Sequence, residues 1–100
     1  MQLHLEIDEL NLLANVLMEP TGEIPRPAVD GRLLDMVLAR DLRFDSDELE
    51  RLEALLFETE RRTKDDLLNE KETACRFELK SRLALLDRVL EKVDEACVMI

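Results

Sequence analysis

The residues of this sequence that could take part in chemistry are carboxylates, two cysteines and one histidine. His4 stands alone near the N-terminus, whereas zinc and di-iron sites require companion ligands at fixed spacing. A run that begins like a calcium-binding loop starts at Asp45. That pattern requires glycine at its sixth position, which is Glu50, and glutamate at its twelfth, which is Leu56. We therefore interpret Asp45 or Ser46 as a helix cap and His4 as a solvent-facing residue.

A second group of carboxylates surrounds one short segment and comprises Asp65, Asp66, Glu70 and Glu72. Clustered carboxylates can bind a hard metal ion, so a carboxylate-based metal protein or small enzyme is one alternative. Runs of charge are more often solvated faces of helices. We therefore expect a non-enzymatic chain with no catalytic, cofactor-binding or metal-ligating residues.

The two cysteines, Cys75 and Cys97, lie 22 positions apart and form no Cys-x-x-Cys motif. The N-terminal residues lack the basic and continuous apolar regions of a signal peptide. A chain without an export signal usually keeps its cysteines reduced, and free cysteines are often buried. We therefore expect a cytoplasmic protein with two buried thiols.

The composition excludes several classes of protein. The chain has 100 residues, which corresponds to a single domain, and 46% of them are hydrophobic, which is enough for a core. Its net charge of −10 disfavours binding to nucleic acid or to an anionic membrane surface. No segment has the roughly 18 continuous apolar residues that a membrane span needs. The acidity fits a regulator that docks on a basic surface of another protein, which is a second alternative.

The first part of the chain predicts an extended arm and two short helices. Residues 1–8 alternate apolar and polar side chains, and we expect an arm that packs on helices; a strand paired across a dimer is the alternative. Apolar spacing predicts helices at 9–18 and 31–41, separated by a loop at 19–30 that is rich in proline. That loop is either a strap over the surface or a docking loop for a partner.

The rest of the chain predicts a long antiparallel helical hairpin at 46–98 with its turn near 69–73. Its second helix repeats apolar residues at alternating spacings of four and three, which is the heptad pattern of a coiled coil. The seam consists of Leu79, Leu83, Leu86, Leu90, Val93, Cys97 and Ile100. With the turn near residue 71, positions whose numbers sum to about 141 should face each other.

The outer end of this hairpin predicts a contact surface. Beyond a polar zone around Thr59 and Thr63, we expect an apolar cluster of Leu67, Leu68, Ala74, Cys75 and Phe77. Surface charge pairs alone would leave such a hairpin frayed, because each contributes only about 0–1 kcal/mol. Burying Leu67, Leu68 and Phe77 would contribute about 1.5–3 kcal/mol apiece. Our hypothesis is that these three residues pack on a second subunit in a twofold dimer; the alternative is a short hairpin closed on its own Leu67–Phe77 contact.

Two segments carry a resemblance to known proteins. The opening "LHLEIDELNLLANVL" and the closing "KSRLALLDRVLEKV" resemble small uncharacterised bacterial proteins of helical type. The resemblance covers about half of the chain and consists of packing patterns, so it implies a helical fold and bacterial origin but no active site. Together these observations predict an all-α protein of about four helices that acts through protein–protein contact or self-association.

Overall fold

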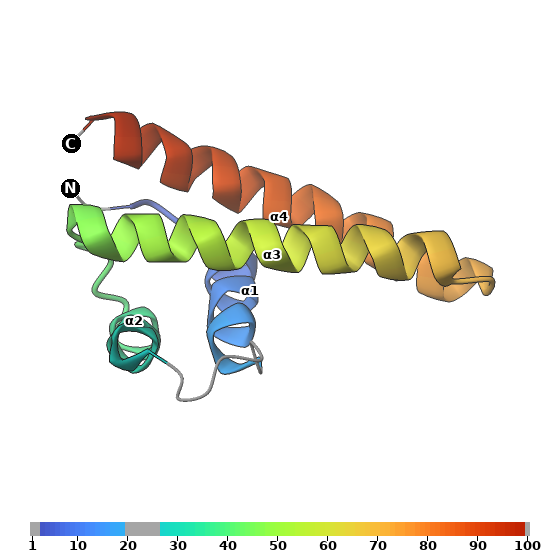
Figure 1. The fold of residues 1–100 in the computed structure, drawn as a ribbon, viewed down its shortest axis with the longest axis horizontal. Helices are drawn as coiled ribbons and strands as arrows, with labels where there is room; N and C mark the ends of the chain where they lie inside the picture. The colour runs from blue at the N-terminus through green and yellow to red at the C-terminus, as the bar shows by residue number, and fades with distance from the viewer. Residues whose placement is uncertain (1–2, 20–26, 100) are drawn as a thin grey trace.

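The computed structural model describes residues 3–19 and 27–99 and is built from four helices. These are α1 (Ile7–Met18), α2 (Ala28–Leu38), α3 (Ser46–Asn69) and α4 (Thr73–Met99). Helices α3 and α4 run side by side as an antiparallel hairpin, while α1 and α2 lie against its base (Figure 1). The end that carries the turn projects beyond α1 and α2 (Figure 1). The predicted all-α class with a long C-terminal hairpin is confirmed.

Helix α1 begins two residues before the expected residue 9 because Glu6 caps it. The carboxylate of Glu9 accepts a hydrogen bond from the backbone N–H of Glu6 at 2.9 Å, and the two residues form a capping box. Asp8 lies in the first turn instead, where its carboxylate pairs with Arg88 of α4 at 3.2 Å. The sequence alone does not show which of the neighbouring acidic residues Glu6 and Asp8 caps the helix.

Helix α2 begins and ends three residues before the expected 31–41. Pro27 precedes its first turn, where a missing backbone N–H costs nothing. At its end Arg40 adopts a left-handed conformation with a φ of 58°. The N–H groups of Arg40 and Asp41 donate to the carbonyls of Val37 and Met36 at 3.1 and 2.9 Å, which is a Schellman closure. This end could not be predicted, because a left-handed position that closes a helix is usually occupied by glycine.

The N-terminal arm packs on its own chain. Residues 3–6 are extended, Leu3 is buried in the core, and its backbone N–H donates to the carbonyl of Leu42 at 3.1 Å. This agrees with the expected arm rather than with a strand paired across a dimer. Most of the expected 19–30 loop, and with it the predicted docking loop, lies outside the described residues.

The core lies at the base of the hairpin, where side chains from all four helices meet. Its apolar members include Leu12, Leu13, Val16, Leu17, Leu33, Val37, Phe44, Leu49, Leu52, Leu56, Leu86, Val89, Leu90 and Val93. The seam of α4 is therefore buried from Leu86 to Val93, whereas Leu79, Leu83 and Cys97 on either side are only half-buried. Thr59 and Thr63 are buried as well, so the expected polar zone is partly closed. Their hydroxyls donate to the carbonyls of Leu55 and Thr59 at 2.9 and 2.7 Å, which satisfies the buried oxygens.

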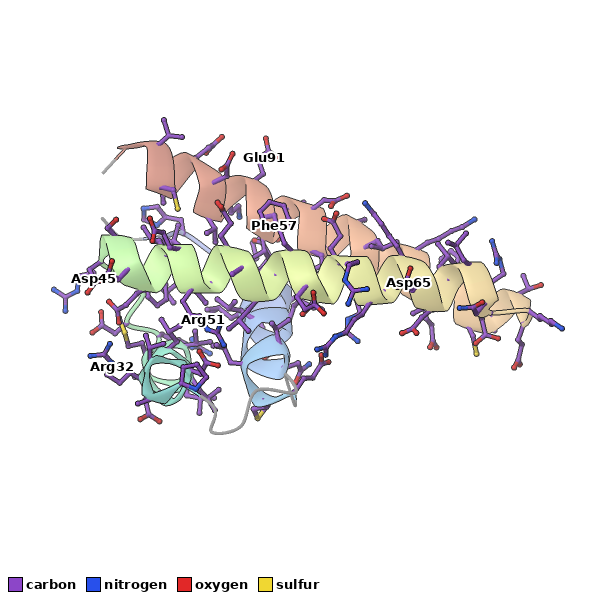
Figure 2. All side chains as sticks on the ribbon, in the orientation of Figure 1. Arg32, Asp45, Arg51, Phe57, Asp65 and Glu91 are labelled. Atoms are coloured by element: carbon purple, nitrogen blue, oxygen red, sulfur yellow. The ribbon has the colours of Figure 1, made fainter. Side chains whose placement is uncertain are left out.

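Two ion pairs with buried carboxylates join the helices at the base. Asp30 of α2 is only 2% exposed, and Arg51 of α3 donates to both of its oxygens, at 2.7 and 2.9 Å. Figure 2 shows Arg51 on the side of α3 that faces α2. Burial alone would raise the pKa of the Glu9 carboxyl, but hydrogen bonds from Lys92, at 2.7 Å, and from the Glu6 backbone hold that pKa below its ordinary value. The Glu9 carboxylate is therefore stabilised as a charged group, and the Asp30 carboxylate is paired with Arg51 through both of its oxygens.

Among the described helices, none combines the length and the apolar character needed to cross a lipid bilayer.

Candidate functional site: the tip of the hairpin

The turn between α3 and α4 is held by hydrogen bonds within the tip itself. The guanidinium of Arg76 donates through Nη1 to the carbonyls of Leu67 and Glu70, at 2.8 and 3.0 Å. The carboxylate of Glu70 accepts hydrogen bonds from the backbone N–H groups of Lys71 and Glu72, both at 3.0 Å. These contacts satisfy backbone groups that every helix end leaves without intrahelical partners. The turn lies at residues 70–72, as the sequence predicted.

The apolar residues that were expected to form a cluster at this tip lie at the surface. Leu68 is 82% exposed and Phe77 is 72% exposed, while Leu67 is half-buried. Ala74 is exposed, Cys75 is half-buried, and none of the five joins the core. The described part of the chain therefore does not cover Leu68 and Phe77, and the tip presents them to solvent on a hydrogen-bonded turn.

The stretch of α3 that leads to the tip carries a ladder of ion pairs within the helix. Arg61 contacts Glu58 at 2.6 Å and Asp65 at 3.2 Å, and Lys64 contacts Glu60 at 2.9 Å. Figure 2 shows Asp65 on the projecting part of the hairpin. Pairs of this kind, three or four residues apart, stabilise a helix by about 0.2–0.5 kcal/mol each. The ladder therefore supports α3 locally but does not attach the tip to the core.

Two carboxyl pairs cross the hairpin, and the sequence analysis missed them. Glu53 lies within hydrogen-bonding reach of Asp94, and Glu60 lies within reach of Asp87. The numbers of each pair sum to 147, so the register differs from the expected sum of about 141. The members of the two pairs are seven residues apart on each helix, and that heptad spacing was the signal that could have revealed them.

The environment of these carboxyls shifts their titration in opposite directions. Burial, followed by the charge of Asp94, raises the pKa of Glu53, and one of its oxygens is buried without a hydrogen-bond donor among the described residues. The hydrogen bond with Glu60, followed by burial, raises the pKa of Asp87. The hydrogen bond from Lys64, followed by that of Asp87, lowers the pKa of Glu60. The α3–α4 contact therefore includes like charges that oppose it at neutral pH.

Two groups of side chains place possible metal ligands within 4.8 Å of one another: Glu70 with Glu72 and Cys75, and Glu6 with Asp8 and Glu9. In the first group Glu70 already accepts two backbone N–H groups of the turn. In the second group Glu9 already accepts the N–H of Glu6 and the ammonium of Lys92. These contacts account for both groups as helix caps. Asp65 and Asp66, which the sequence placed beside Glu70 and Glu72, belong to neither group.

The two cysteines are half-buried rather than fully buried as expected. Burial, followed by the charge of Glu70, raises the pKa of Cys75. Burial, followed by the charge of Glu53, raises the pKa of Cys97. Because the thiolate is the reactive form, both side chains are poor nucleophiles at neutral pH.

Comparisons of this chain with protein-family models, with curated proteins and with solved structures found no match. The resemblance of its first and last helical segments to small bacterial proteins therefore stays an expectation, and the function has to be argued from the geometry of the hairpin.

Proposed function

We propose that this chain is a non-enzymatic protein that works by protein–protein contact, and that it self-associates through the hairpin tip as a twofold dimer. The observation that carries the proposal is the exposure of Leu68 and Phe77 on a turn that is already ordered by Arg76 and Glu70. Binding to an ordered surface loses less conformational entropy than binding to a flexible one. The tip is therefore a preorganised apolar contact, with Leu67 at its edge.

A second copy suits the tip for two reasons. A twofold dimer buries the same surface on both chains. Leu68 and Phe77 of one chain would therefore be removed from water together with the same two residues of the other chain. Basic and acidic residues also alternate around the turn, and an antiparallel arrangement of two tips can bring opposite charges together. These residues are Glu70, Lys71, Glu72, Arg76, Glu78 and Lys80. A stable interface buries about 800 Å² on each partner, so the flanks of α3 and α4 would contribute as well.

The test is the mass of the protein in solution. The wild-type chain should have the mass of a dimer in light scattering, and the double variant Leu68→Glu with Phe77→Glu should have that of a monomer. Val98→Glu is the matched control, because Val98 is 79% exposed on α4 but lies far from the turn. A monomeric wild-type chain at high concentration, or a double variant that stays dimeric, would refute the proposal.

A second candidate is an acidic regulator that docks on a basic protein surface. The carboxyl pair Glu53–Asp94 favours it, because lysine or arginine from a partner would relieve the repulsion between these two side chains. This candidate would be supported if a basic partner protein co-purified with the chain and were released when the salt concentration was raised.

The alternative of a carboxylate-based metal protein is tested by equilibration with divalent metals followed by dialysis. Two free cysteines favour a reducing compartment such as the cytoplasm for all of these roles.

A further inference from the structure

One face of the hairpin, near its base, combines carboxylates with two exposed apolar side chains. From α3 it carries Glu50, Glu53 and Phe57, which follow one another at helical spacings of three and four residues. From α4 it carries Asp94, within hydrogen-bonding reach of Glu53, and Val98 one turn further on. Phe57 is 54% exposed beside α4 (Figure 2), and Val98 is 79% exposed. These five residues are called the acidic face below.

The acidic face lacks positive charge. No lysine or arginine in the described part of the chain forms an ion pair with Glu50, Glu53 or Asp94. The charges that act most strongly on the neighbouring Cys97 thiol belong to these same three carboxylates. One oxygen of Glu53 is also buried without a donor among the described residues. A ligand of this face therefore has to bring both a cation and a hydrogen-bond donor.

Neither a metal ion nor a second copy of the chain matches this face. Among the described residues, the groups that bring three possible metal ligands within 4.8 Å of one another contain none of these carboxylates. A second copy carries the same net charge of −10, which opposes association through an acidic surface. Exposed apolar side chains on both sides of a carboxyl pair instead match a segment of another protein that is both basic and apolar.

The spacing along the face fits a helix. Facing positions of α3 and α4 have numbers that sum to 147, so Val98 lies level with residue 49 and is eight residues from the level of Phe57. Eight residues correspond to about 12 Å of helix axis, and the Glu53–Asp94 pair lies midway. Positions i, i+4 and i+8 of a partner helix cover the same length on one side. The carboxylates offer only acceptors, so the backbone carbonyls of an extended segment would find no donor in them.

We propose that the acidic face binds a basic amphipathic helix of another protein. An arginine of that helix donates to the Glu53–Asp94 pair, and an aliphatic side chain one turn away on each side packs on Phe57 or Val98. The inference rests on the second candidate function, the acidic regulator, and specifies its surface and the class of its partner. It does not depend on the hairpin tip.

The probe is a fluorescently labelled, alanine-rich helical peptide of about 18 residues, long enough to form helix in water, with leucine, arginine and leucine at positions i, i+4 and i+8. The control peptide has the same composition, with the arginine moved two positions and so turned away from the leucines. Anisotropy titrations of the full chain should show about tenfold tighter binding of the first peptide, with an affinity that falls as salt is added.

Three variants of the chain locate the contact. Glu53→Gln with Asp94→Asn should weaken binding of the first peptide by about tenfold, because the arginine loses its charged acceptors. Phe57→Ala should weaken it by about fivefold, because an aromatic contact is removed. Asp66→Asn with Glu78→Gln is the matched control, since it removes the same charge from exposed positions of α3 and α4 near the tip. It should change affinity by less than about twofold, because distant charges are screened.

The outcomes separate this surface from the function on which it rests. If the first peptide bound the Glu53→Gln, Asp94→Asn variant or the Phe57→Ala variant as tightly as the wild-type chain, the acidic face would be the wrong surface although a basic helix still bound. Equal binding of the two peptides would refute recognition of the spacing. If neither peptide bound at low salt, the acidic regulator would be refuted as well. A melting curve verifies that each variant is folded, and their masses in light scattering should equal that of the wild-type chain.

Discussion

The base of this molecule and its projecting tip are stabilised in different ways. At the base, leucines from four helices are removed from water, and the carboxylates of Asp30 and Glu9 are buried against Arg51 and Lys92. At the tip, ion pairs join residues of α3, Arg76 of α4 donates across the turn to the carbonyl of Leu67, and Leu68 and Phe77 remain exposed. Burial supplies most of the free energy of folding, whereas local pairs supply little.

Because of this difference, the base and the tip should tolerate substitution of their side chains to different degrees. The base cannot lose a side chain without leaving a cavity or an unpaired charge. The tip can exchange its apolar side chains at little cost to the folded monomer, so any need for Leu68 and Phe77 would lie in an intermolecular contact. Three measurements would break or sharpen this contrast.

The largest expected effect is at the Asp30–Arg51 pair. Asp30→Ala should lower the free energy of unfolding by about 3–5 kcal/mol, because it leaves the Arg51 guanidinium without its buried partner. Chemical denaturation measures this loss. Asp35→Ala, on an exposed position of the same helix, should change stability by less than about 0.5 kcal/mol. If Asp30→Ala lowered the free energy of unfolding no more than Asp35→Ala does, then the Asp30–Arg51 pair would contribute little to the stability of the base.

A matched pair of leucines on α3 compares the two regions directly. Leu56 is fully buried in the base and Leu68 is exposed at the tip. Leu56→Ala should cost about 2–5 kcal/mol through lost burial and a residual cavity. Leu68→Ala should change the stability of a monomer by only about a few tenths of a kcal/mol, because Leu68 is exposed and the higher helix propensity of alanine favours the variant. Thermal and urea unfolding of both variants measure these changes in stability. If Leu68→Ala destabilised the protein as much as Leu56→Ala, the difference between the base and the tip would be wrong.

The smallest effect is expected at the carboxyl pair Glu53–Asp94. The folded pKa of Glu53 lies above its ordinary value of 4.5, because of burial and then Asp94, with Glu50 adding to it and the Cys97 thiol opposing it. The stability contributed by such a group is fully present below pH 4.5 and is lost as pH rises through the folded pKa. Glu53→Gln should therefore be more stable than the wild-type chain at pH 7, with the difference shrinking as pH falls towards 4.5.

Denaturant unfolding at several pH values measures this difference between the variant and the wild-type chain. Glu91→Gln is the matched control, because Glu91 lies on α4 with its side chain exposed and is not among the charges that act on Glu53. If Glu53→Gln were less stable than the wild-type chain at pH 7, then the Glu53 carboxylate would be stabilising and the described repulsion would be wrong.

The hairpin could be predicted because its signals are local and repeated. The leucine spacing of α4 identifies a helix without any tertiary information. The predicted cap at Asp45 is confirmed, and the structure adds a capping box with Glu48 at 2.8 and 3.0 Å. The class of fold and the position of the turn follow from these patterns. The start of α1 and the end of α2 could not be located, because a choice among neighbouring acids and a left-handed arginine depend on the surrounding structure.

The buried carboxylates were beyond a pattern-based interpretation. Asp30 and Glu9 are buried only because another helix places a cation beside each of them, and the local sequence pattern does not contain that information. The Glu53–Asp94 contact depends on the register between α3 and α4, which the heptad pattern alone does not specify. At the tip, the sequence identified Leu67, Leu68 and Phe77 as candidates but not the role of Arg76, whose guanidinium reaches back across the turn. Whether a second chain covers these residues stays a prediction.

Helix α4 also separates the two sulfur atoms of the chain. Cys75 lies beside the turn and Cys97 lies near the C-terminal end, so 22 residues at ~1.5 Å of helical rise place them about 33 Å apart. A disulfide requires Cα atoms within about 7 Å. Oxidation of the folded protein therefore cannot close a loop within one chain, and every disulfide that it forms must join two molecules.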